Sequence, residues 1–127
     1  MRDKTVPRLQ FILVDKNPAR AAAIFAALLS HGRGITVSEG LGELTSGSPA
    51  GRYVVLAADE AGTIAEVVEK LSQARSGAKI IAYGENPSPH RIVQVMAAGA
   101  ADYLPWPLDP ATIVAAAHAA IAAGRAA

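Results

Sequence analysis

The chain of 127 residues contains no cysteine, few aromatic residues and no excess of charge of either sign. The lack of cysteine excludes disulfides, thiol catalysis and cysteine-ligated metals. Twelve basic residues stand against 11 acidic ones, and they form no basic run or stripe, so we expect no direct binding of nucleic acid. No apolar run is long enough for a membrane span or a secretory signal. These absences favour a cytoplasmic protein that does not bind membranes.

Hydrophobic residues make up 51% of the chain although aromatic residues supply only 5%, and alanine accounts for much of the difference. This composition predicts an aliphatic core and numerous helices that pack closely through small side chains. A chain of this length can bury one core but not two. We therefore expect a single domain over residues 1–127.

Short aliphatic runs alternate with longer, Ala-rich helical patterns, which is typical of a parallel sheet covered by helices on both faces. The expected strands are residues 9–14, 34–38, 53–56, 79–83 and 101–104. The expected helices begin at 18, near 41, at 63, after 89 and at 110, and end near 32, 45, 74, 99 and 124. The sequence thus predicts five strands and five helices in strict alternation.

The last third of the chain carries the most specific motif, MAAGAADYLPWPLDP over residues 96–110. This segment resembles the AGADDYLxKPF segment of receiver domains from bacterial two-component response regulators. The resemblance extends over essentially the whole chain, since an acid, Asp15, also ends the first expected strand. It implies a flavodoxin-like fold with strand order 2-1-3-4-5 and a functional crevice at the carboxyl ends of the strands.

In that family, two adjacent acids after the first strand and an aspartate that ends the third strand hold Mg²⁺. The third-strand aspartate accepts the phosphoryl group, and a hydroxyl residue and a lysine ending the fourth and fifth strands bind it. Here the first acid is kept as Asp15, but Lys16 stands in the position of the second. Tyr83 stands in the hydroxyl position, and Trp106, followed by Pro107, stands in the lysine position. The resemblance therefore implies a degenerate pocket.

The end of the third strand can be aligned in two ways. The first alignment, which we favour, puts Ala57 in the acceptor position and leaves no phosphoryl acceptor. The second puts Asp59 there, and only in that case would Asp15 and Asp59 serve as ligands of Mg²⁺. In the favoured alignment we expect no metal and no cofactor.

Three further side chains each allow two interpretations. The ammonium group of Lys16 could replace the metal ion, or it could be solvated. Tyr83 and Trp106 could fill the former phosphate pocket, or they could be exposed as anchors for a partner. We also expect the Trp106–Pro107 peptide bond to be cis, because the family's Lys–Pro bond typically is and an aromatic residue precedes the proline.

No glycine-rich phosphate loop follows any expected strand, and no nucleophile, base and orienting residue can be assembled, so we expect no enzymatic activity. Our leading hypothesis is a pseudo-receiver, a phosphorylation-independent protein–protein interaction module in bacterial signal transduction. We expect it to bind a protein partner or a second copy through its fourth helix, fifth strand and fifth helix. The expected contact residues are Arg91, Gln94, Val95, Tyr103 and Trp106. The alternative is an atypical response regulator that accepts a phosphoryl group on Asp59.

Overall fold

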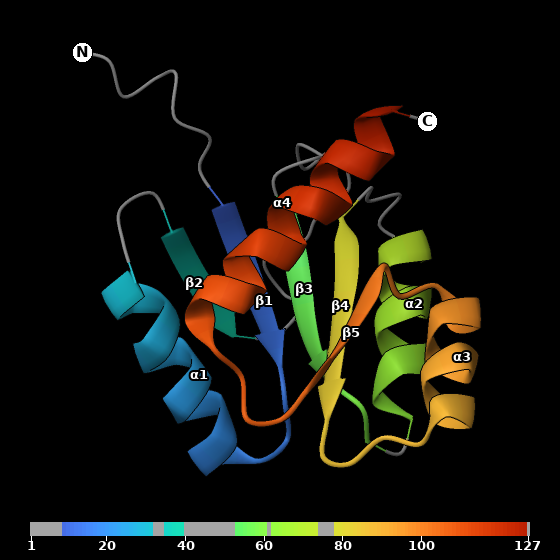
Figure 1. Cartoon of the computed structure of the whole chain (residues 1–127), viewed down its shortest axis with the longest axis horizontal. Helices are drawn as coiled ribbons and strands as arrows, with labels where there is room; N and C mark the ends of the chain where they lie inside the picture. Colours follow the sequence, from blue (N-terminus) through green and yellow to red (C-terminus); the bar gives the residue numbers. More distant parts are fainter. Residues whose placement is uncertain (1–8, 32–34, 40–52, 61, 74–77, 127) are drawn as a thin grey trace.

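The computed structural model of the chain describes residues 9–31, 35–39, 53–60, 62–73 and 78–126, which form an α/β domain (Figure 1). The strands are β1 (Leu9–Val14), β2 (Ile35–Glu39), β3 (Tyr53–Ala58), β4 (Lys79–Gly84) and β5 (Asp102–Pro105). The helices are α1 (Pro18–His31), α2 (Thr63–Gln73), α3 (Pro89–Ala98) and α4 (Pro110–Ala126). The helix expected near residues 41–45 lies outside the described residues.

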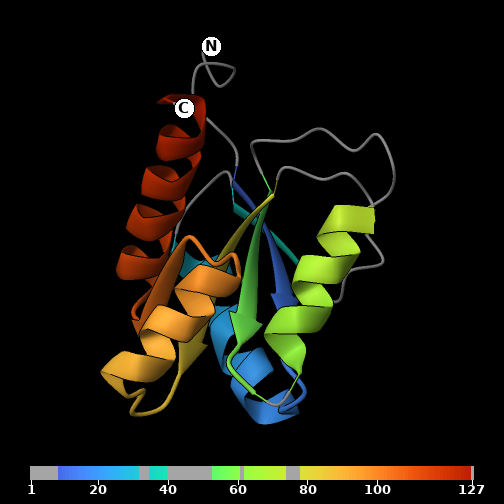
Figure 2. The same ribbon diagram turned by 90° about the vertical axis from the view of Figure 1, so that its right-hand side faces the viewer.

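All strand pairs are parallel, and the sheet has the order β2-β1-β3-β4-β5. This order confirms the predicted flavodoxin-like arrangement. Strand β3 runs two residues further than predicted, to Ala58, because it continues its pairing with β4 as far as Tyr83. Helices α1 and α4 cover one face of the sheet, whereas α2 and α3 cover the other (Figures 1 and 2).

Each face of the sheet contributes to its own apolar core, because successive residues of a strand point to opposite sides. Leu13 and Leu56 pack towards α1 and α4, and Ile12 and Val55 pack towards α2 and α3. All four side chains are buried. Burying one such side chain contributes about 1.5–3 kcal/mol to folding, so a sheet covered on both faces accounts for the nearly continuous aliphatic runs of β1 and β3.

Three helices begin with the same local pattern. A capping residue comes first, proline is the first residue of the helix, and the second and third helical residues complete the pattern. The side chain of each capping residue accepts a hydrogen bond from the backbone N–H of that third residue, which is a typical N-cap. The three bonds join Asn17 to Arg20 (3.1 Å), Ser88 to Arg91 (3.0 Å) and Asp109 to Thr112 (3.1 Å). Each cap fixes the backbone of the first turn, and so fixes the direction in which the side chain of the third residue points away from the helix.

Two sequence-based expectations outside the sheet can also be compared with the structure. The Trp106–Pro107 peptide bond is cis, as predicted. Within the described parts of the chain, none of the helices has the length and the apolar character that crossing a bilayer requires.

Candidate functional site

Parallel strands end at one edge of the sheet, and polar side chains gather at this carboxyl edge. Asp15 follows β1, and Asp59 follows β3 directly, with its backbone N–H donating to the carbonyl of Tyr83 in β4 (2.7 Å). Trp106 follows β5 and donates its backbone N–H to the carbonyl of Gly84 (2.8 Å). Each of the two aspartates forms the centre of a separate cluster.

The first cluster, called the Asp15 cluster, consists of Asp15, Arg20, Tyr83 and Glu60. Arg20 donates two hydrogen bonds to the carboxylate of Asp15, from Nε to Oδ2 (2.6 Å) and from Nη2 to Oδ1 (2.7 Å). The hydroxyl of Tyr83 donates to Oδ2 (2.6 Å), and the backbone N–H of Asn17 donates to Oδ1 (2.9 Å). The side chain of Asp15 is 0% exposed, so both of its oxygens are enclosed by donors.

These contacts explain the charge states in the Asp15 cluster. Burial alone would raise the pKa of Asp15, but the hydrogen bonds from Arg20, Tyr83 and the Asn17 N–H outweigh burial and lower this pKa below its ordinary value. Burial and the hydrogen bond to Asp15 raise the pKa of Tyr83. The tyrosine therefore keeps its proton and the aspartate keeps its charge.

The guanidinium of Arg20 connects two acidic residues. Besides its contacts with Asp15, its Nη2 lies 3.0 Å from Oε2 of Glu60. It lies also 6.0 Å from the centre of the Tyr83 ring, where a cation interacts favourably with the aromatic face. A cation of the chain itself therefore stands between the two carboxylates.

The donor set does not fit Mg²⁺. This ion requires octahedral oxygen ligands at about 2.0–2.1 Å, whereas the oxygens of Asp15 already accept bonds from Arg20, Tyr83 and a backbone N–H. Among the described residues, no group of three or more histidine, aspartate or glutamate side chains is arranged to hold a metal ion. The Asp15 cluster thus has the chemistry of a closed ion pair.

The second cluster, called the Asp59 cluster, consists of Asp59, Arg91 and Tyr103. Arg91 donates from Nη2 to Oδ1 of Asp59 (2.6 Å) and from Nε to Oδ2 (3.0 Å), while the Tyr103 hydroxyl donates to Oδ2 (2.6 Å). The side chain of Asp59 is 7% exposed and that of Arg91 is 44% exposed. The hydrogen bonds from Arg91 lower the pKa of Asp59 against the opposing effect of burial.

The two clusters are built alike: each aspartate is bound by one arginine and one tyrosine. Both arginines are the third residue of a helix whose N-cap is followed by proline, in Asn17-Pro-Ala-Arg20 and Ser88-Pro-His-Arg91. Sequence reasoning missed the role of Arg20. The signal that could have found it is this repeated motif, because the first turn of a helix that follows a parallel strand lies at the carboxyl edge of the sheet.

The remaining residues of the expected pocket have clear positions. Lys16 is exposed, so Arg20 and not Lys16 places a cation beside Asp15. Ala57 is fully buried inside β3, where it belongs to the apolar core beneath α2 and α3. Tyr83 is buried and Trp106 half-buried, with their ring centres 6.2 Å apart at an angle of 35°. Because Tyr83 is buried with its hydroxyl on Asp15, the interpretation of Tyr83 as an exposed anchor is wrong. Pro107 itself is exposed.

The expected interaction surface needs correction at two residues. Val95 is buried in the core beneath α3, and Tyr103 is buried with its hydroxyl on Asp59, so neither side chain is available for a partner. Arg91 and Gln94 are exposed, although the guanidinium of Arg91 is engaged with Asp59. The physical reason is that the buried stripe of α3 includes position 95, while its neighbours face solvent.

The sequence and the fold of this chain can be compared with those of known proteins. Neither a protein-family model nor a curated protein sequence matches the chain. Solved structures do match: the receiver domain of Francisella response regulator 1452 has 13% sequence identity and a TM-score of 0.69 over 92% of this chain and 99% of that one. The chain has the receiver-domain fold.

Two further structures with this fold belong to proteins of different kinds, a response regulator and a pilus assembly protein. A response regulator from Burkholderia pseudomallei, solved with a phosphorylated aspartic acid and a calcium ion, is 19% identical, with a TM-score of 0.67 over 93% of this chain and 71% of that one. The pilus assembly protein CpaE from Caulobacter crescentus is 23% identical, with a TM-score of 0.60 over 90% of this chain and 94% of that one. At these identities the likeness concerns the fold, and the site must be judged from its own residues.

Proposed function

We propose that this receiver-like domain is a pseudo-receiver, a protein–protein interaction module of the bacterial cytoplasm that works without phosphorylation. The observation that carries the proposal is the closure of the Asp15 cluster. Arg20 and Tyr83 bind both oxygens of Asp15, whose side chain is completely buried. A domain whose carboxyl edge is held in one state by its own side chains suits a scaffold role better than that of a switch.

The chemistry of phosphoryl transfer supports the proposal. Moving a phosphoryl group onto a carboxylate brings negative charges together, so the transition state needs cations aimed at the phosphoryl oxygens. In the crevice of this chain the two arginines already neutralise Asp15 and Asp59. Lys16 is exposed, and Trp106 carries no charge in the expected lysine position. The replacement of the expected lysine by Trp106 therefore removes charge stabilisation that the reaction would require.

The alternative function is phosphoryl acceptance on Asp59. It is favoured by one observation, since Asp59 follows β3 directly at the carboxyl edge, with the cation of Arg91 beside it. Against it, both oxygens of Asp59 are engaged by Arg91 and Tyr103.

The partner of the module belongs to signal transduction or, by analogy with CpaE, to pilus assembly.

The deciding experiment is intact-mass spectrometry after incubation with acetyl phosphate and Mg²⁺. We expect no phosphoryl adduct on the parent chain, under conditions in which an active response regulator in the same tube is labelled. The matched variants are Asp59→Asn and Asp15→Asn. An adduct on the parent that is absent from Asp59→Asn would refute the pseudo-receiver and establish the alternative.

A further inference from the structure

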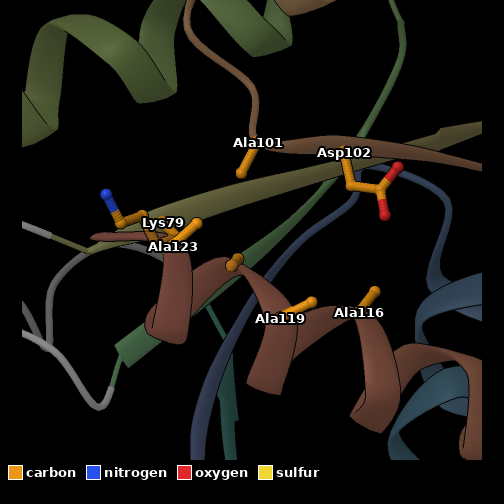
Figure 3. A pocket seen from close by; sticks show the side chains of 7 residues that line it. Lys79, Ala101, Asp102, Ala116, Ala119 and Ala123 are labelled. Carbon is orange, nitrogen blue, oxygen red and sulfur yellow. The ribbon is translucent and has the colours of Figure 1, made fainter. Parts of the chain in front are cut away.

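A groove with a volume of about 380 Å³ lies at the edge of the sheet where β4 and β5 begin, against the second half of α4 (Figure 3). It is lined by five alanines together with Lys79 and Asp102. These two side chains carry opposite charges, so the groove does not favour a ligand of one charge over a ligand of the other.

A smaller groove, with a volume of about 180 Å³, lies between α2 and α3, the two helices in front of the sheet in Figure 2. We call it the α2–α3 groove. Its floor is apolar, since Ile64 and Val95 are buried. Its mouth is open at Gly62, where an added Cβ would meet no atom within 4 Å. Sites for drug-sized ligands usually measure about 300–1,000 Å³, so this groove has room for a single side chain.

Glu60 lines the α2–α3 groove and lacks a full share of positive charge. Its Oε2 lies 3.0 Å from Nη2 of Arg20, but the same nitrogen donates to Oδ1 of Asp15 (2.7 Å). One guanidinium thus serves two carboxylates. The other oxygen of Glu60, Oε1, is buried and has no hydrogen-bond partner, which is unfavourable. The side chain as a whole is 40% exposed, so its carboxylate can turn the free oxygen towards the groove.

The opposite rim of the groove leaves this negative charge uncompensated. Arg91 donates from Nε and Nη2 to Asp59, and its Nη1 lies 3.4 Å from the amide oxygen of Gln94. Its charge is therefore used by Asp59. The two clusters together hold three carboxylates, of Asp15, Asp59 and Glu60, against two guanidiniums. This excess favours a cation in the groove.

We propose that the α2–α3 groove binds a lysine side chain of a partner protein. The four-carbon stem lies over Ile64 and Val95, as lysine stems do on apolar surfaces, and the ammonium group donates to Oε1 of Glu60. An ammonium group suits this place better than a guanidinium, because Arg20 already occupies Oε2 and the planar fork of arginine uses both oxygens. This inference rests on the proposed function, since it names a chemical feature by which the interaction module recognises its partner.

Gln94 explains why the lysine belongs to a polypeptide. Its amide oxygen faces Arg91, and its amide nitrogen takes part in none of the hydrogen bonds among the described residues. That nitrogen can donate to a backbone carbonyl beside the bound lysine. A free alkylamine offers no such acceptor, so it should bind more weakly than a lysine flanked by peptide groups.

The test is an NMR titration of the full, ¹⁵N-labelled chain with acetyl-lysine-methylamide, in which two peptide groups flank the side chain. A single side chain should bind with a dissociation constant of about 1–10 mM, and the shift changes should be confined to the start of α2 and to α3. Acetyl-norleucine-methylamide has the same four-carbon stem without the ammonium group and should bind about tenfold more weakly. n-Pentylammonium, which has the stem and the charge without peptide groups, should also bind more weakly.

Two pairs of variants locate the binding. Glu60→Gln keeps the shape of the side chain and should weaken acetyl-lysine-methylamide about tenfold, whereas Glu66→Gln, an exposed change on α2, should have no effect. Ala98→Leu should block the groove that Ala98 lines. Ala97→Leu, at the neighbouring exposed position outside the groove lining, is its matched control and should bind like the parent.

Several results would overturn the proposal. One is the absence of shift changes at the groove when the lysine probe is well above the expected dissociation constant. Another is equal binding of the lysine and norleucine probes, or equal binding by the parent and Glu60→Gln. Equal binding of n-pentylammonium would assign the groove to a free amine and not to a protein side chain. None of these outcomes depends on the acetyl phosphate experiment, so a failed lysine site and a failed pseudo-receiver are distinguishable.

Discussion

The substitution Arg20→Met tests the role of the Asp15 cluster. It keeps the long aliphatic stem of the side chain but removes the guanidinium that binds Asp15 and Glu60. Asp15 is then a carboxylate with a side chain that is 0% exposed and without a cation. Removing one partner of a buried ion pair costs about 3–5 kcal/mol, and because Arg20 is itself 14% exposed we expect about 3 kcal/mol.

Arg91→Met provides the matched control, because Arg91 has the same relation to Asp59 that Arg20 has to Asp15. The side chain of Arg91 is 44% exposed, so solvent screens its ion pair and the loss should be only about 1 kcal/mol. The assay is urea unfolding followed by the fluorescence of Trp106, the only tryptophan of the chain. With a urea m-value of about 1–3 kcal/mol/M, the two variants should have clearly different midpoints.

The pH dependence gives the same prediction a second readout. In the parent chain the pKa of Asp15 is lowered, so its contribution to stability is present above the unfolded carboxyl pKa of about 4 and is lost as the pH falls through the folded value. Without Arg20, burial should raise this pKa, so the folded variant takes up a proton as the pH falls. The difference in stability between parent and Arg20→Met should therefore be largest at neutral pH and shrink towards pH 4.

Two results would refute this reasoning. One is an equal loss of stability in Arg20→Met and Arg91→Met, because the argument depends on the difference in burial. The other is an unchanged cost of Arg20→Met in a chain that also carries Asp15→Asn. In that background the buried carboxylate charge of Asp15 is gone, so removal of Arg20 leaves no unpaired aspartate, and a double-mutant cycle should show strong coupling between the two residues.

The remaining predictions concern the tyrosines of the two clusters. Gly84→Ala should destabilise the domain by about 1–3 kcal/mol in the same urea assay, because the added Cβ would collide with the hydroxyl of Tyr103. Gly62→Ala is the control for backbone strain without a collision, because Gly62 has a φ of +78° and a Cβ added there meets no other atom within 4 Å. Burial and the neighbouring aspartates raise the pKa of Tyr83 and of Tyr103, so an ultraviolet titration of the folded chain should show both phenols still protonated near pH 11, above the ordinary tyrosine value of about 10. If the absorbance shows that all three tyrosines are ionised at that pH while the chain is still folded, the hydrogen bonds of Tyr83 to Asp15 and of Tyr103 to Asp59 are contradicted.

Much of the fold could be predicted because it depends on local patterns. Aliphatic runs that are buried on both faces identified the five strands, and a capping residue followed by proline identified where α1 and α4 begin. The boundaries were less certain at β3, because its end at Ala58 depends on pairing with β4, a neighbour in space.

The site was predicted less completely. Asp15 and Tyr83 were expected at the carboxyl edge and lie there, because a residue at the end of a parallel strand must lie at that edge. Asp59 was expected there only in the less favoured alignment, whereas Ala57, the favoured candidate, is buried inside β3. Arg20 was missed, since its contact with Asp15 requires the cap at Asn17 and the angle at which α1 leaves β1. Val95 was assigned to the surface because helical periodicity alone does not say which side of α3 meets the sheet.

The sequence by itself determined the alternation of strands and helices, the aliphatic core and the absence of a normal acidic pair after β1, because composition and short-range pattern carry this information. The tertiary structure alone decided that each aspartate is enclosed by an arginine and a tyrosine from other elements. It alone also decided that Lys79 and Asp102 border one groove. The reason is that hydrogen bonds and ion pairs act over a few ångströms in space, so they depend on which elements the packed core brings together.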